Sequence, residues 1–157
     1  MRPSTAFRDR ITADGSSGFK AESGRYHLYI SWAFPWAHRT AIMRKLKGLE
    51  DVISLSVVDP IMGEEGWAFS DYPSSIPDSV NGTKYLRDDY LKADPKFTRR
   101  DTVPILWIKK LTKLLINESR NIIKMLNTGF VDFVKNIFNF YPENLQSKRE
   151  EIIDCNL

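Results

Sequence analysis

Apolar and polar side chains alternate along residues 25–30, which is the pattern of a β-strand. Tyr26, Leu28 and Ile30 share one face of this segment, and the residues between them share the other face. Residues 52–58 are apolar and rich in β-branched side chains, so we expect a second strand that is buried.

A helix is expected between these strands, at residues 36–47. Its apolar stripe comprises Ile42, Leu46 and Leu49, which are spaced i, i+4 and i+7. Pro35 suits the first helical turn, and a glycine follows the last one. A strand, a helix and a strand in this order predict a βαβ unit with parallel strands and a right-handed crossover.

The regular pattern resumes after residues 60–83, a long irregular segment that contains prolines, glycines and serines. A short helix is expected at residues 85–91. Two short apolar runs, at residues 105–108 and 114–116, predict a hairpin, and residues 118–126 predict a closing helix. A parallel pair followed by an antiparallel hairpin and a helix is the arrangement of a thioredoxin-like α/β domain.

The two ends of the chain lack this order. Residues 1–23 are polar and aperiodic, so we expect a flexible or loosely docked lead-in. Residues 129–157 are expected to be a connecting segment containing a helix with one apolar face. The members of that face are Phe130, Phe133, Val134, Ile137 and Phe138. Left uncovered, the face predicts self-association or contact with a partner; the alternative is that it folds back onto the domain.

The composition fits one globular domain of 157 residues, 42% of them hydrophobic. The net charge is +3, with basic and acidic residues interleaved, so nucleic-acid binding is not expected. The apolar runs are too short to predict a membrane span. The single cysteine, Cys155, cannot form an internal disulfide, which favours a reducing compartment and a cytoplasmic protein. No metal site is expected.

Residues 24–40 contain a motif long enough to indicate a particular protein family. Residues 24–40 read Gly-Arg-Tyr-His-Leu-Tyr, a short linker, and Phe-Pro-Trp-Ala-His-Arg-Thr. Further blocks follow at 44–54, 66–67, 90–95, 100–107 and 117–119. In this order the blocks resemble the xi class of glutathione transferases, which is omega-like and includes the glutathionyl-hydroquinone reductases. The resemblance implies a thioredoxin-like, glutathione-binding domain at 24–128, followed in the family by an all-helical domain that this chain is expected to lack.

Phe34 stands where the family carries its catalytic cysteine. In the family, a thiolate at this helix N-terminus attacks a glutathionyl-hydroquinone and forms a mixed disulfide with glutathione, which a second glutathione resolves. Phenylalanine has no nucleophile, so the resemblance implies that this route is closed. Cys155, in the tail, is interpreted as an incidental surface thiol and not as a substitute.

The resemblance also implies a glutathione site at the start of the last helix. There Glu118 would receive the γ-glutamyl ammonium, and Ser119 with the helix N-terminus would bind the carboxylate. The alternative is that Ser119 only caps the helix. Pro104 is expected to be cis, so that the backbone of Val103 would pair with the cysteinyl backbone of the peptide; an ordinary proline at the start of a strand is the alternative.

Four further contacts complete the implied site: Trp67, Arg100, Asp101 and Thr102. Trp67 would cover the glutathione, with core packing as the alternative. Asp101 replaces a residue that is usually apolar in the family, which leaves only its backbone as a family-like contact. His38 and Arg39 are expected to have structural roles.

Three functions stay open at this stage. The first is a glutathione-dependent reductase or transferase. The second is a non-catalytic glutathione-binding or interaction domain derived from such an enzyme. The third is a non-functional fragment of a longer gene product.

Overall fold

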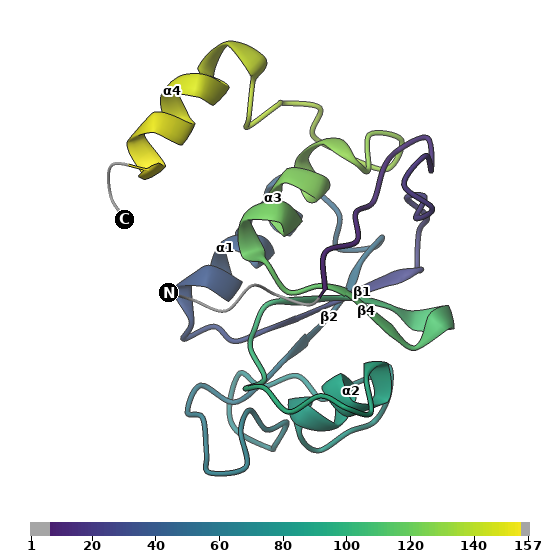
Figure 1. The fold of residues 1–157 in the computed structure, drawn as a ribbon, viewed down its shortest axis with the longest axis vertical. Helices are drawn as coiled ribbons and strands as arrows, with labels where there is room; N and C mark the ends of the chain where they lie inside the picture. Colours follow the sequence, from purple (N-terminus) through teal and green to yellow (C-terminus); the bar gives the residue numbers. More distant parts are fainter. Residues whose placement is uncertain (1–6, 155–157) are drawn as a thin grey trace.

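A four-stranded sheet forms the centre of the computed structural model, which describes residues 7–154 (Figure 1). Its strands are β1 (Tyr26–Ile30), β2 (Ser54–Val57), β3 (Ile105–Ile108) and β4 (Lys113–Ile116), in the spatial order β2-β1-β3-β4. β1 is parallel to β2 and antiparallel to β3, and β3 and β4 are antiparallel. The predicted βαβ unit and hairpin are therefore confirmed, and the fold is thioredoxin-like.

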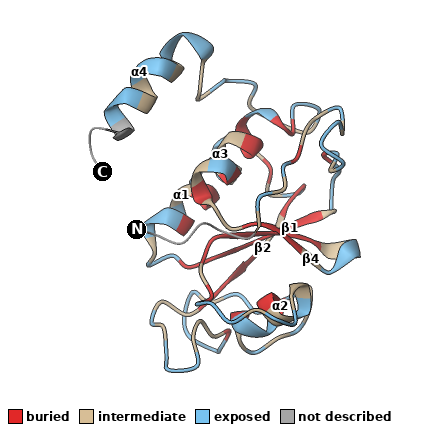
Figure 2. Ribbon diagram, in the orientation of Figure 1, coloured by how far each residue is buried: buried red, intermediate tan, exposed pale blue. Residues whose placement is uncertain are grey.

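Helices cover both faces of this sheet. α1 (Pro35–Leu46) and α3 (Ser119–Thr128) lie on one face, and α2 (Leu86–Ala93) lies on the other with the long loop that precedes it (Figure 1). A 3-10 turn at Lys109–Leu111 joins β3 to β4, and α4 (Glu143–Asp154) lies beyond α3. Because both faces are covered, every residue of β1 is buried (Figure 2). Within residues 7–154, no helix is long and apolar enough to cross a membrane.

The buried face of α1 differs from the predicted stripe. Ile42 and Leu46 are 49% and 45% exposed, so their prediction as core residues is wrong. Small side chains, Ala37, Thr40 and Ala41, face the domain instead. Apolar spacing alone identified a stripe, but small side chains on the neighbouring face allow the helix to approach its partners closely, and tertiary packing selected that face.

Residues 131–142 are not helical, contrary to the prediction for this segment. The tail instead crosses the C-terminal end of α1, where the last backbone carbonyls of a helix need hydrogen-bond donors. The Asn136 side chain donates to the Leu46 carbonyl at 3.1 Å, and the Lys135 N–H donates to the Lys47 carbonyl at 3.0 Å. These bonds hold the tail in a conformation that a helix could not adopt.

The five residues predicted to form an apolar face therefore separate. Phe130 is fully buried in the core, and Phe133 and Val134 pack partly against it. Ile137 and Phe138 are 89% and 62% exposed.

The described part of the expected lead-in is docked onto the domain. Ile11 is buried in the core. The Asp9 N–H donates to the Leu115 carbonyl at 3.2 Å, and the Asp9 carboxylate pairs with Lys113. Residues 8–9 thereby run beside the outer edge of β4, which would otherwise leave backbone groups unpaired.

A buried carboxylate fastens the long loop to the sheet. Asp78 accepts hydrogen bonds from the Tyr29 hydroxyl of β1 at 2.8 Å and from the Val80 and Asn81 N–H groups. Thr83 donates to it through both its N–H and its hydroxyl. Burial works to raise the pKa of Asp78, but these hydrogen bonds outweigh it and lower the pKa, so the carboxylate is charged.

Candidate glutathione site

Phe34 is the N-cap residue, immediately before α1. Its backbone is extended, and its carbonyl accepts from the N–H groups of Ala37 and His38, both at 2.9 Å. The Phe34 ring is half-buried against the core, and its centroid lies 6.4 Å from that of Trp67. The positive end of the α1 dipole is therefore faced by an apolar ring, which offers it no negative charge.

The Val103–Pro104 peptide bond is cis, as expected. The pairing of β3 with β1 starts at Ile105, so the Val103 backbone lies just outside the ladder. Thr102 is anchored beside it, because the buried Tyr90 hydroxyl donates to the Thr102 carbonyl at 2.9 Å. Asn117 donates in turn to the Tyr90 hydroxyl at 3.1 Å, which joins this segment to the approach to α3.

Asp101 is buried and holds the turn that carries Trp67. Its carboxylate accepts the Trp67 backbone N–H at 3.2 Å. Gly66 has a φ of +94°, and a Cβ there would come within 2.9 Å of both carboxylate oxygens. The Asp101 side chain is thus already engaged by the protein, and a glycine at position 66 is required both by its φ and by this close approach.

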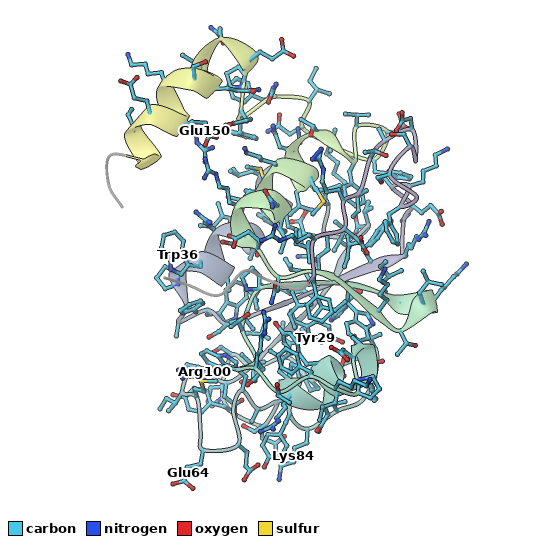
Figure 3. The ribbon with its side chains drawn as sticks, in the orientation of Figure 1. Tyr29, Trp36, Glu64, Lys84, Arg100 and Glu150 are labelled. Atoms are coloured by element: carbon cyan, nitrogen blue, oxygen red, sulfur yellow. The ribbon has the colours of Figure 1, made fainter. Side chains whose placement is uncertain are left out.

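Arg100 lies on an exposed edge of the molecule near the turn at Glu64 (Figure 3). Its guanidinium donates to the Met62 sulfur at 3.0 Å, a weak acceptor for a cation. Arg100, Glu64 and Met62 are among the residues that line a surface cavity of about 390 Å³.

The N-terminus of α3 carries the other predicted residues. Glu118 precedes the helix, and its carbonyl accepts from the N–H groups of Asn121 and Ile122. Ser119 is buried at the first helical position. The N–H groups at the start of this helix have no acceptor within the helix itself, which makes them available to an anion.

Arg39 also lies at the N-terminus of α3, and the sequence did not predict this position. Its Nε and Nη2 donate to the Ser119 Oγ at 3.2 and 2.5 Å, and its guanidinium lies 4.6 Å over the Trp36 ring. Burial lowers the pKa of Arg39, and the Glu118 carboxylate opposes that shift. Its position one and a half turns into α1 was the only sequence signal, because contact with Ser119 depends on how α1 packs against α3.

The structure thus connects the predicted residues in two groups. Phe34, Trp67 and Asp101 form one, and Ser119 belongs to the other, where it contacts Arg39, a residue that was not among those predicted. Among residues 7–152, no group of three or more His, Asp or Glu side chains is arranged to hold a metal. Cys155 lies outside the described residues.

Comparison with known proteins identifies the relatives of this arrangement. Residues 35–128 match the family described as glutathione S-transferase, N-terminal domain. The chain is 49% identical to the glutathionyl-hydroquinone reductase YqjG of Escherichia coli, over 97% of this chain and 48% of that protein. It is 48% identical to the glutathionyl-hydroquinone reductase PcpF of Sphingobium chlorophenolicum, over 97% of this chain and 47% of that protein.

Solved structures of similar proteins point to the same family as the sequence relatives. The Xi-class transferase of Natrialba magadii superposes with a TM-score of 0.91 and 46% identity, over 96% of this chain and 47% of that one. The glutathione-bound structure of Escherichia coli YqjG gives 0.90 and 49%, over 94% of this chain and 50% of that one. The chain spans about half the length of the curated relatives it matches. It belongs to the glutathione transferase family and, within that family, to the Xi class.

Proposed function

We propose that this chain binds glutathione and is impaired in the cysteine-dependent reduction of glutathionyl-hydroquinones. The observation that carries the proposal is Phe34 at the N-terminus of α1. A cysteine there would have its thiolate stabilised by the helix dipole and by free N–H groups. A phenyl ring can form no bond to a glutathione sulfur, so the mixed disulfide has no place to form.

The proposed glutathione contacts are Trp67, the backbone from Arg100 to Val103, and the Glu118–Ser119 pair. Glutathione carries a carboxylate and an ammonium at its γ-glutamyl end. The start of α3 offers N–H groups and a serine for the first, and Glu118 offers a carboxylate for the second. The glutathione bound in the similar Escherichia coli structure supports glutathione as the ligand.

A weaker transferase activity is compatible with this site. The N–H groups at the start of α1 could stabilise the thiolate of bound glutathione itself, which would then be the nucleophile. We also propose a cytoplasmic location, because the chain has a single cysteine and a thiol peptide as its ligand.

The test compares the wild type with Phe34→Cys, both carrying Cys155→Ser so that only position 34 differs in thiol chemistry. Calorimetry should detect glutathione binding to the wild type, and Phe34→Cys should bind more tightly because the ring no longer occupies space near the sulfur. With glutathionyl-hydroquinone, only Phe34→Cys should acquire a glutathione adduct by mass spectrometry. Turnover by the Phe34 protein well above the uncatalysed blank would refute the impairment, and loss of all glutathione binding would refute the site.

A further inference from the structure

The Ser119 hydroxyl can form one more hydrogen bond, and only as a donor. A serine hydroxyl has one hydrogen and two lone pairs. Arg39 fills the lone pairs by donating from Nε and Nη2 at 3.2 and 2.5 Å. Ser119 is 4% exposed, and its hydroxyl hydrogen has no acceptor among the described residues. Since buried polar groups are normally satisfied, this hydrogen points to an acceptor that residues 7–154 do not supply.

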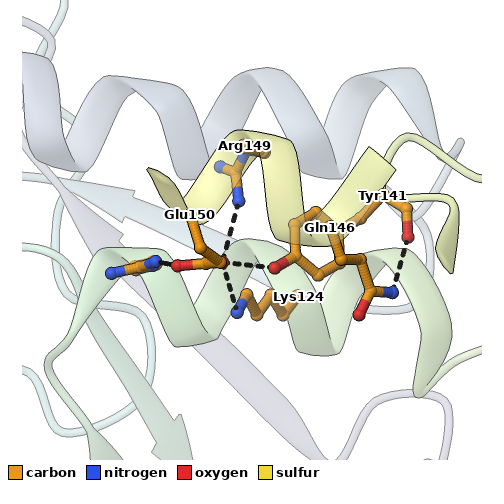
Figure 4. A network of polar contacts seen from close by, with 6 residues as sticks. Lys124, Tyr141, Gln146, Arg149 and Glu150 are labelled. Carbon is orange, nitrogen blue, oxygen red and sulfur yellow. Dashed lines mark hydrogen bonds and ion pairs between the residues drawn. The ribbon is translucent and has the colours of Figure 1, made fainter. Parts of the chain in front are cut away.

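Arg39 itself forms no ion pair within the described residues, although the Glu118 carboxylate is near enough to act against the lowering of its pKa by burial. Within the described part of the chain, no carboxylate forms an ion pair with it; its contacts are the Ser119 hydroxyl and the face of Trp36. The neighbouring cations differ, because Arg120 and Lys124 both pair with Glu150 (Figure 4). Arg39 is therefore the cation at the start of α3 that no ion pair occupies, which leaves its guanidinium able to receive an anionic ligand.

We propose that Arg39 is a binding residue of the glutathione site. By occupying both lone pairs of the Ser119 hydroxyl, Arg39 leaves that hydroxyl as a donor to the γ-glutamyl carboxylate, and it places a positive charge beside the same carboxylate. The inference rests on the proposed function. Its chemistry favours an anion such as a carboxylate over a neutral group, because the serine hydrogen and the guanidinium are both hydrogen-bond donors and the guanidinium is positively charged. The Trp36 ring, stacked on the guanidinium, holds that geometry before the ligand binds.

The experiment uses two ligands that differ only in this carboxylate. Glutathione carries it, whereas γ-aminobutyryl-cysteinylglycine keeps the chain and the ammonium but lacks it. We expect Arg39→Gln to bind glutathione about 10-fold more weakly than wild type, which is the scale of one charge-assisted contact, and to bind the analogue unchanged. Arg39→Lys, which keeps the charge but loses the paired donors, should lie between. Lys45→Gln removes one exposed cation from the same helix and should alter neither affinity.

The outcomes separate the inference from the proposed function. If wild type binds neither ligand, the proposed function fails, and the inference falls with it. If wild type binds glutathione and Arg39→Gln binds it equally well, the inference alone fails. Equal weakening for both ligands would mean that Arg39 only supports the fold, and it too would overturn the proposal. Should Arg39→Gln fail to fold by thermal unfolding, Arg39→Lys carries the same comparison.

Discussion

At the scale of single residues, the hydroxyl proton of Thr83 decides which of two buried carboxyl groups, Asp78 or Asp89, is ionised. The Thr83 Oγ1 lies 3.0 Å from an oxygen of Asp78 and 2.8 Å from an oxygen of Asp89, but it has one hydrogen to give. Asp78 receives several other donors and is charged. Asp89 is therefore the member of the pair that takes up a proton, and in its protonated form its carboxyl donates to the Thr83 hydroxyl. Its burial, with the charge of Asp78 adding to the effect, raises its pKa to about 7.

This pair predicts a pH dependence with a definite sign. The pKa of Asp89 is about 7 in the folded state and 3.8 in the unfolded one. The folded state thus holds a proton that the unfolded state has released, and stability falls as the pH rises from about 4 to about 7. Asp89→Asn mimics the protonated form, so its stability relative to wild type should increase across this window by up to about 4 kcal/mol, the linkage energy of about three pKa units.

Urea unfolding between pH 4 and 8 measures this difference. The matched control is Asp88→Asn, an exposed neighbour on α2, which should show no such trend. A constant difference between Asp89→Asn and wild type at all pH values would show that Asp89 is ionised in the folded protein.

At the scale of elements, α4 is attached through one carboxylate. Glu150 accepts from the Tyr141 hydroxyl and pairs with Arg120 and Lys124 of α3 (Figure 4). The apolar side chains of α4 contribute little burial, since Leu145 and Ile152 are both more than half exposed. The helix is therefore bound by polar contacts that are open to solvent and are screened by salt.

Removing that carboxylate should release α4 without unfolding the domain. We expect Glu150→Ala to cost less than about 1 kcal/mol of global stability, as is usual for exposed pairs. Proteolysis within α4 and hydrogen exchange of its backbone should nevertheless accelerate clearly. The neighbouring Glu151→Ala serves as the control, because Glu151 is exposed and takes no part in the network. Equal protection of α4 in Glu150→Ala and wild type would contradict this account.

At the scale of the whole molecule, two exposed apolar side chains of the tail lie near an exposed leucine at the end of α1. Ile137 and Phe138 are consecutive and largely exposed, beside the half-exposed Leu46 whose carbonyl anchors the tail. We expect self-association through this surface, because large apolar side chains left in water favour contact with a second apolar surface.

Sedimentation measures the association directly. Wild type should show a reversible, concentration-dependent species, which Ile137→Asp combined with Phe138→Asp should abolish. Leu111→Asp, an equally drastic change at an exposed site in the β3–β4 connection, should leave it intact. A wild type that stays monomeric at every concentration tested would contradict the prediction that this surface drives self-association.

Features that depend on residues close together in the sequence were predicted correctly, whereas features that depend on distant residues were not. The strand at 105–108 and the βαβ unit followed from local apolar patterns, and the implied cis bond before Pro104 is present. The face of α1 was mispredicted, because Ile42 and Leu46 match a helical stripe as well as the small residues that are buried. The tail was mispredicted for a related reason: its helical spacing was overridden by hydrogen bonds to the end of α1.

The sequence by itself determined the order and type of the central elements, the family, and the presence of phenylalanine where a nucleophile would act. These depend on residue identity and on neighbours within a few positions. Only the tertiary structure decided that Arg39 meets Ser119, that Asp101 holds the Trp67 turn, and that Thr83 joins two carboxylates. The first two contacts join residues more than thirty positions apart and depend on how separate elements pack, which no local pattern encodes. The Thr83 contacts are close in sequence, but they depend on the fold of an irregular loop, for which the sequence has no periodic pattern.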